Sequence, residues 1–255
     1  MSANPRWHYI QSRLQARHGE RLHEADWRNL DAAQTIERYI EQTRLTPLRR
    51  FTDCIHGAMN SHAIEHGLRS VWRDYVMEIS VWLSPAWQPA VLWTACFPDL
   101  PAIDALLKGA QPHWASEDPN LAIFTGVASR PTGRSKNSAK IALASTNGDE
   151  KNLAAQWYAH WRLLWPRCAN ADSRSMHKLA HIIVKHFEQL DRALSSESSN
   201  PYRRELSRKL AQLFRQNSAS PTAVFSHLAL VALDLERLRG SLARRSLFHG
   251  AREAA

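Results

Sequence analysis

"LALVALDLERLRGSLARRSLF" covers Leu228 to Phe248, close to the end of the chain, and it decides the class of fold. Apolar residues recur there every three or four positions, which is the spacing of one face of an α-helix. The residues of this face are Val224, Leu228, Val231, Leu235, Leu238 and Leu242. The first half of the stretch is apolar all round, and a helix of that kind has to be surrounded by protein. We therefore expect a helix that begins in the core of an α-helical protein.

The second half of the same stretch is apolar on one side only. From Asp234 onward the opposite side carries polar and charged residues, namely Glu236, Arg237, Gly240, Ser241 and Arg244. Cations near the C-terminus of a helix interact favourably with its dipole, which accounts for Arg244 and Arg245 but not for Arg237 and Arg239. We therefore expect the helix to leave the core with its arginines facing outward.

The rest of the chain repeats the helical pattern. Helical spacing of apolar residues recurs in 7–14, 64–82, 179–194 and 206–214. Six prolines follow a residue type that caps helices, and proline is favoured in the first turn of a helix. They are Pro5, Pro47, Pro85, Pro119, Pro201 and Pro221. With no alternating strand pattern, the predicted fold class is all-α, a multi-helix bundle with no significant sheet.

One further helix start is predicted from a pair of polar residues. Asp31 and Gln34 have the spacing of a capping box, in which each side chain bonds to the other residue's backbone amide. The apolar positions Ile36, Tyr39 and Ile40 follow directly. We therefore expect a helix capped by Asp31.

The composition limits the class of protein. A chain of 255 residues is long enough for one large domain or two small ones. Its net charge of +9 favours an acidic partner. Three scattered cysteines fit a reducing compartment, and the start of the chain lacks the apolar run of a signal peptide. The longest clean apolar run, Ala90–Phe97, is too short to span a bilayer. We expect a soluble, cytoplasmic protein without an integral membrane segment.

The stretch 126–152 interrupts the helical pattern. It is poor in large apolar side chains and rich in Ser, Gly, Asn and Lys. Such a segment cannot bury enough surface to offset the entropy lost when it becomes ordered. We expect a flexible linker or loop at 126–152, between an N-terminal helical region, 1–125, and a C-terminal helical region, 153–255. One domain with packed termini is the alternative.

A possible metal motif lies in "HAIEH", His62–His66. It matches the H-x-x-E-H pattern of a group of zinc peptidases, in which two histidines bind zinc and Glu65 would be the general base. At 100° per residue, however, both histidines lie opposite Ile64, which belongs to the apolar face. We expect two exposed histidines and no metal, with a zinc-dependent hydrolase as the remote alternative. The pair His177 and His181, with His186 beyond it, is likewise expected at the surface.

Three tryptophans form a stripe with helical spacing. Trp157, Trp161 and Trp165 lie near Arg162 and Arg167, and aromatic rings among basic residues can stack on nucleic-acid bases. An aromatic stripe with this spacing more often belongs to a core. We expect core packing here, and a basic nucleic-acid-binding protein stays open as an alternative function.

Both ends of the chain resemble the V-type ATPase C/d family, a family of non-catalytic helical proteins. "YIQSRLQARHGERL", Tyr9–Leu22, is similar to the opening helix of that family, with its aromatic-led apolar stripe, spaced arginines and a glycine before the next helix. "VALDLERLRGSLARRSLF" is similar to the family's last helix. The resemblance covers 5–45 and 220–248, and the chain is shorter than typical members.

The resemblance implies an all-helical wedge or funnel with packed first and last helices and with neither catalytic residues nor a cofactor. In that family the protein links the cytoplasmic side of the membrane ring to the central rotor stalk. The expected function is therefore a non-enzymatic adaptor that binds acidic protein subunits of a larger complex, peripheral at the inner membrane. The expected partner-binding residues are Arg237, Arg239, Arg244 and Arg245, joined by Arg13 and Arg17 if the two ends pack together.

Overall fold

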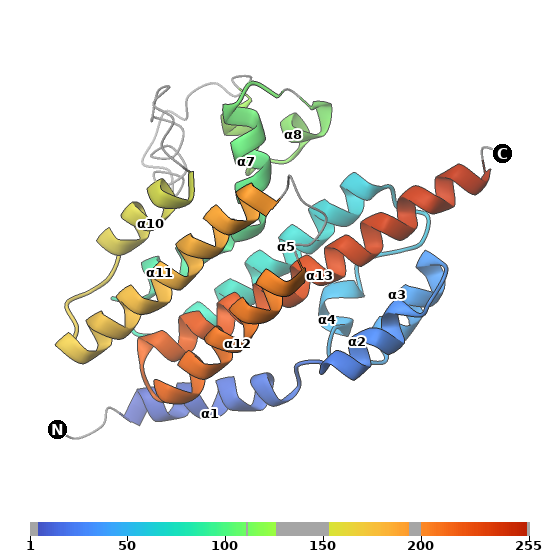
Figure 1. The fold of residues 1–255 in the computed structure, drawn as a ribbon. Coiled ribbons are helices and arrows are strands. Elements are labelled where there is room, and N and C mark those ends of the chain that lie inside the picture. Colours follow the sequence, from blue (N-terminus) through green and yellow to red (C-terminus); the bar gives the residue numbers. More distant parts are fainter. Residues whose placement is uncertain (1–4, 111, 126–152, 194–199, 254–255) are drawn as a thin grey trace. The chain divides into compact units, whose positions relative to one another are not determined.

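The computed structural model describes residues 5–110, 112–125, 153–193 and 200–253, and these contain helices but no strand (Figure 1). The all-α prediction is confirmed. The predicted linker, 126–152, lies outside the described residues. The α-helices are α1 (Pro5–Gly19), α2 (Glu24–Asp31), α3 (Ile36–Arg44), α4 (Arg49–Thr52), α5 (Ser61–Ser80), α6 (Gln88–Trp93), α7 (Leu100–Leu107), α8 (His113–Glu117), α10 (Leu153–Leu163), α11 (Asn170–Ala193), α12 (Asn200–Gln216) and α13 (Pro221–Glu253). Two 3-10 helices are η1 (Thr94–Asp99) and η2 (Ala122–Phe124).

The contacts of the chain divide it into two compact units. Unit 1 contains Met1–Glu78 and Leu210–Ala255, and unit 2 contains Ile79–Lys209. This division differs from the predicted boundary at 126–152, because the end of the chain returns to the N-terminal helices. Composition indicates where a segment cannot form a core, but it does not show which distant helices pack together.

Unit 1 is built around α13, the long helix drawn in red in Figure 1. Both α1 and α3 pack against it, so the first and last helices are in contact as the resemblance implies. The first half of α13 is buried all round, with Leu228, Leu230 and Val231 among its core residues. The prediction that this helix begins in the core is confirmed.

Unit 2 has a core rich in tryptophan. The indole N–H of Trp161 donates to the carbonyl of Ala90 (3.1 Å), and that of Trp157 donates to the thiol of Cys96 (3.1 Å). Trp93 in turn donates to the carbonyl of Trp157 (3.1 Å). Both Trp157 and Trp161 are buried, so the stripe packs α10 against α6 and η1. Core packing is confirmed for these two tryptophans, which are not available for stacking on bases.

One segment of the described chain, Gln88–Leu107, is long and apolar enough for a membrane span. It extends beyond the shorter apolar run, Ala90–Phe97, found in the sequence. Half of it is buried inside the fold, and core helices of soluble proteins meet the same criterion. The segment is also divided among α6, η1 and α7. These observations give no reason to assign it to a membrane.

Three of the six prolines begin α-helices, and the other three belong to turns. Helix starts are found at Pro5, Pro201 and Pro221. At the remaining sites the polar residue before the proline makes a local turn. The side chain of Thr46 accepts from the amide of Leu48 (3.2 Å). Residues that cap helices also stabilise turns, which is why this pattern predicted too many helices.

The helix start predicted at Asp31 is wrong. Asp31 is the last residue of α2, and the cap of α3 is Thr35, whose hydroxyl accepts from the amide of Arg38 (3.3 Å). The capping-box spacing arose by chance, because the Asp31 carboxylate accepts instead from Arg237 and Ser241 of α13.

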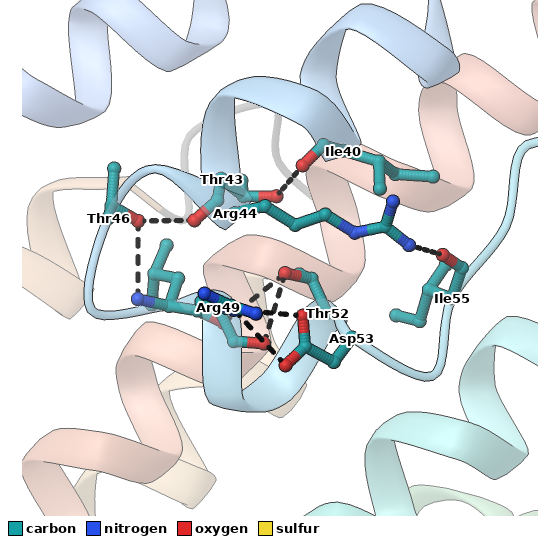
Figure 2. A network of polar contacts seen from close by, with 9 residues as sticks. Ile40, Thr43, Arg44, Thr46, Arg49, Thr52, Asp53 and Ile55 are labelled. Atoms are coloured by element: carbon teal, nitrogen blue, oxygen red, sulfur yellow. Dashed lines mark hydrogen bonds and ion pairs between the residues drawn. The ribbon is translucent and has the colours of Figure 1, made fainter.

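The corner between α3 and α4 is fixed by side chains that bond to the backbone (Figure 2). The hydroxyl of Thr43 donates to the carbonyl of Ile40 (2.8 Å), and that of Thr46 donates to the carbonyl of Thr43 (2.7 Å). Arg44 reaches across the corner and donates to the carbonyl of Ile55 (2.9 Å). These bonds satisfy backbone groups that the end of α3 leaves without helical partners.

Candidate protein interface

Arg245 lies inside the fold and not on its surface. Only 5% of this residue is exposed. Its guanidinium donates to the carbonyls of Ala33 (2.9 Å), Asp31 (3.0 Å) and Ser241 (2.9 Å), and lies 4.1 Å from the centre of the Tyr39 ring. The prediction that Arg245 faces a partner is wrong, because the end of α2 and the start of α3 cover this side of α13. Ser241 is buried there too, against expectation.

Arg237 is half-buried and joins α13 to α2. It forms a forked ion pair with Glu24 (2.9 and 3.1 Å) and a second ion pair with Asp31 (3.2 Å). Its guanidinium also lies 4.7 Å from the centre of the Trp27 ring. The carboxylates and the aromatic face that Arg237 would seek on a partner are therefore already supplied by the protein itself.

Arg239 and Arg244 are the two arginines of α13 that the fold does not use. Arg244 is exposed and Arg239 is half-buried, and neither forms a hydrogen bond or ion pair with a described residue. We call this pair the outer arginine face. Its two members lie five residues apart, so they are about 140° apart around the helix and about 7.5 Å apart along it.

The two arginines predicted on α1 have different surroundings. Arg13 is exposed and donates to the hydroxyl of Tyr9 (2.8 Å), with its guanidinium 5.6 Å from the ring centre. Arg17 turns inward, where it forms an ion pair with Glu78 and lies 5.1 Å from the centre of the Tyr75 ring. Arg13 therefore lies where a partner at the surface of α1 would meet it, whereas Arg17 contributes to the interior of unit 1.

The structure does not bring the six predicted arginines into one site. The side chain of Gln11 on α1 accepts from the amide of Ala219, just before α13 begins, so Arg13 lies near that end of the helix. Arg244 follows Ala219 by 25 residues, which is roughly 35 Å along a helix. Arg13 and the outer arginine face would thus contact different parts of a partner, or different partners.

A buried polar cluster was not foreseen from the sequence. Arg21, in the connection between α1 and α2, pairs with Asp234 of α13 through two hydrogen bonds (2.6 and 2.8 Å). Arg50 of α4 pairs with Glu78 (3.1 Å), and its guanidinium lies 4.8 Å from the centre of the Tyr75 ring. A signal for it was present, because Asp234 is the one acidic residue in the apolar half of α13 and a buried carboxylate needs a cation.

Burial and charge set the protonation of this cluster. Burial lowers the pKa of His227 to about 3, with neighbouring His18 and arginines adding to the effect. The neutral ring accepts or donates one hydrogen bond at the Tyr75 hydroxyl (2.7 Å). Burial raises the pKa of the Glu78 carboxyl, but Arg17 and Arg50 lower it by more. Glu78 is therefore ionised and balances the two arginines beside it.

The cluster surrounds a pocket of about 40 Å³, which has room for only a few water molecules. Arg17, Arg21 and Arg50 line it, together with Glu20 and Asp234. Because carboxylates offset these cations, the pocket has little positive charge left with which to hold an anion. Its chemistry is that of a polar core that joins α1, α4, α5 and α13.

The histidines of the possible zinc motif lie as the helical phase predicts. His62 and His66 are exposed on α5, whereas Ile64 between them is buried. Glu65 faces Arg69 at 3.9 Å, within the limit for an ion pair. Among the described residues no three metal-binding side chains lie together.

The histidines of α11 differ from the prediction. His181 is exposed, but His177 is half-buried and bonds to the hydroxyl of Tyr158 (3.0 Å). His186 is buried, and burial lowers its pKa to about 4. The prediction of surface histidines is wrong for His186, because it shares the apolar face of α11 with Leu179 and Ile183.

Comparisons with known proteins place no relative beside this chain: no family model, curated protein or solved structure matches it.

Proposed function

We propose that this protein is a non-enzymatic helical adaptor that binds acidic protein subunits of a larger complex. The observation that carries the proposal is the division of labour among the four arginines of α13. Arg237 and Arg245 bond within the fold, whereas Arg239 and Arg244, the outer arginine face, have no acidic partner among the described residues. Arginine suits such a contact because its planar guanidinium forms paired hydrogen bonds with carboxylates.

The contact between α1 and α13 supports a more specific form of the proposal. Packed first and last helices are what the resemblance to the V-type ATPase C/d family implies. We propose that the chain is a short, divergent member of that kind, which couples a membrane ring to a rotor stalk. Such a protein would be cytoplasmic and peripheral to the membrane through its partners.

The proposal makes arginine contacts at the rim of an interface responsible for recognition. Exposed charges of this kind act mainly through the association rate and its dependence on salt, because water and ions screen them. Binding of the acidic partner should therefore weaken as ionic strength rises. Arg237 and Arg245 should affect binding only through the stability of the fold.

The test is a charge reversal on the outer arginine face. In the double variant Arg239→Glu/Arg244→Glu, partner proteins should co-purify with the full-length chain at about one tenth of the wild-type yield at low salt, since like charges then oppose each other. The matched control is Arg38→Glu, which reverses an exposed charge on α3 of the same unit. It should leave the yield unchanged.

Circular dichroism and thermal melting should first show that both variants fold like the wild type. If the folded double variant then retains every partner at wild-type yield and salt dependence, the outer arginine face is not the interface and the proposal fails. Equal losses in the double variant and in Arg38→Glu would also contradict it, because they would reflect net charge alone.

A further inference from the structure

The corner between α10 and α11 exposes an unusual run of apolar side chains. The sequence "LLWP", Leu163–Pro166, begins at the last residue of α10. Leu163 is 81% exposed, and the three residues after it are half-buried. Burying one such leucine side chain contributes about 1.5–3 kcal/mol, and the protein forgoes this gain at Leu163.

Trp165 stands at the outer end of the aromatic stripe that fills the core of unit 2. Its ring meets the buried Trp161 edge to face, with ring centres 5.0 Å apart, and contacts His177 at 5.2 Å. The amide of Trp165 also donates to the carbonyl of Arg162 (3.3 Å). A half-exposed tryptophan held on a buried stack is preorganised, so a partner that contacts it loses little conformational entropy.

The indole N–H of Trp165 has no hydrogen-bond acceptor. It is shielded from solvent and makes no bond with a described residue, in contrast to the indole groups of Trp93, Trp157 and Trp161. A buried donor without an acceptor costs about 1–3 kcal/mol. A small tilt of the half-exposed ring would present this N–H to an oxygen atom supplied from outside.

The charge around the corner is of one sign. Arg162 and Arg167 flank the apolar run and are both exposed. No acidic residue occurs between Leu153 and Ala171. Tryptophan and arginine are among the residue types most enriched at the energetic centres of protein interfaces. A complementary surface would carry carboxylates around an apolar side chain.

We propose that the α10–α11 corner, residues 162–167, is a docking site for an acidic segment of another protein. The apolar side chain of that segment packs on Leu163 and Trp165, a carboxylate or carbonyl oxygen accepts from the indole N–H, and carboxylates pair with Arg162 and Arg167. This site lies in unit 2 and shares no residue with the outer arginine face, so it stands whether or not the adaptor proposal holds.

The experiment begins with a photoreactive amino acid at position 163 of the full-length chain, expressed in the cell of origin. The control carries the same amino acid at Leu107, an exposed leucine of unit 2 on another helix. Irradiation and mass spectrometry should give a cross-link from position 163, absent from position 107, to a segment of another protein that contains several Asp or Glu residues.

A synthetic peptide with the cross-linked sequence then serves as the probe in binding measurements. We expect Leu163→Ser to raise its Kd at least tenfold, and Arg162→Gln/Arg167→Gln to raise it tenfold at low salt. Trp165→Phe, which keeps a ring but removes the N–H, should raise the Kd three- to tenfold. Leu107→Ser should leave it unchanged. Because Leu163 is exposed, its variant tests the site without risk to the fold.

Several outcomes would overturn the proposal. A cross-link to a second copy of this chain, to nucleic acid or to lipid would show a different occupant. Cross-links equal to those from position 107, or none at all, would show that nothing docks there specifically. A peptide that binds Leu163→Ser as tightly as the wild type would show that the corner does not dock it.

Discussion

Arg244 and Arg245 are neighbours in the sequence with opposite surroundings. The side chain of Arg244 lies in water, whereas that of Arg245 supplies three hydrogen bonds to backbone carbonyls. Two of those carbonyls belong to Asp31 and Ala33, where the chain turns from α2 to α3 and has no helical donors to offer. One arginine therefore serves the fold and the next is placed to serve a partner.

A first prediction compares these two positions. Arg245→Met should lower the free energy of unfolding by about 2–4 kcal/mol, because it leaves two or three buried carbonyls without donors. Arg244→Met should change it by less than about 0.5 kcal/mol, as is usual for an exposed side chain. Urea unfolding of both variants measures the difference. Equal effects would mean that Arg245 does not hold the α2–α3 connection.

Ala219 adopts a backbone conformation that favours glycine. Its φ is 55°, and its amide donates to the side chain of Gln11 (3.0 Å), which fixes this geometry in the turn between α12 and α13. A second prediction follows: Ala219→Gly should stabilise the protein by about 0.5–1 kcal/mol, because the left-handed conformation no longer strains a Cβ atom. Ala229→Gly, within α13, should instead destabilise it by about 1 kcal/mol. Thermal melting distinguishes the two, and a lower melting temperature for Ala219→Gly would refute the first.

At the scale of the element, α13 shows what a helical pattern can and cannot predict. Its apolar face and its all-round apolar first half follow from spacing, and both are found as expected. The burial of Ser241 and Arg245 could not be read from that spacing, because it depends on α2 and α3 lying against the polar side. A polar face is exposed only if no other element offers it hydrogen-bond partners.

The ion pair between Arg21 and Asp234 joins two elements and gives a third prediction. Both side chains are largely buried, and burial raises the pKa of Asp234 although Arg21 lowers it. Either Arg21→Met or Asp234→Leu alone should cost about 3 kcal/mol, because each leaves a charge without its partner. The double variant should recover most of that loss. A double-mutant cycle by urea unfolding measures the coupling, and additive single effects would contradict a direct pair.

At the scale of the whole molecule, the helical class was predictable and the arrangement of units was not. Periodicity is local, so it identifies α1, α5, α11 and α13 from short stretches of sequence. The return of the chain end to the N-terminal helices depends on contacts between residues about 210 positions apart, such as Arg21 with Asp234. For the same reason the interior role of Arg17 was missed, since its partner Glu78 lies on another helix.

Each unit contains one fully or nearly buried histidine, and this leads to a fourth prediction. The pKa of His227 in unit 1 is lowered to about 3 and that of His186 in unit 2 to about 4, both chiefly by burial. An unfolded histidine has a pKa of about 6.5. Below about pH 6.5 the unfolded chain therefore binds protons that the folded chain refuses, so both units should lose stability as the pH falls from 6.5 towards 4.

The slope should reach about 1.4 kcal/mol per pH unit for each of these histidines. His227→Gln keeps a hydrogen-bonding partner for the Tyr75 hydroxyl but removes the titrating ring, so it should remove one proton's share of the slope. Urea unfolding at pH 7, 6 and 5 measures this, with His66→Gln, at an exposed position, as the control. If His227→Gln loses stability between pH 6 and pH 5 as steeply as the wild type does, His227 is not the group whose neutral state the fold of unit 1 requires.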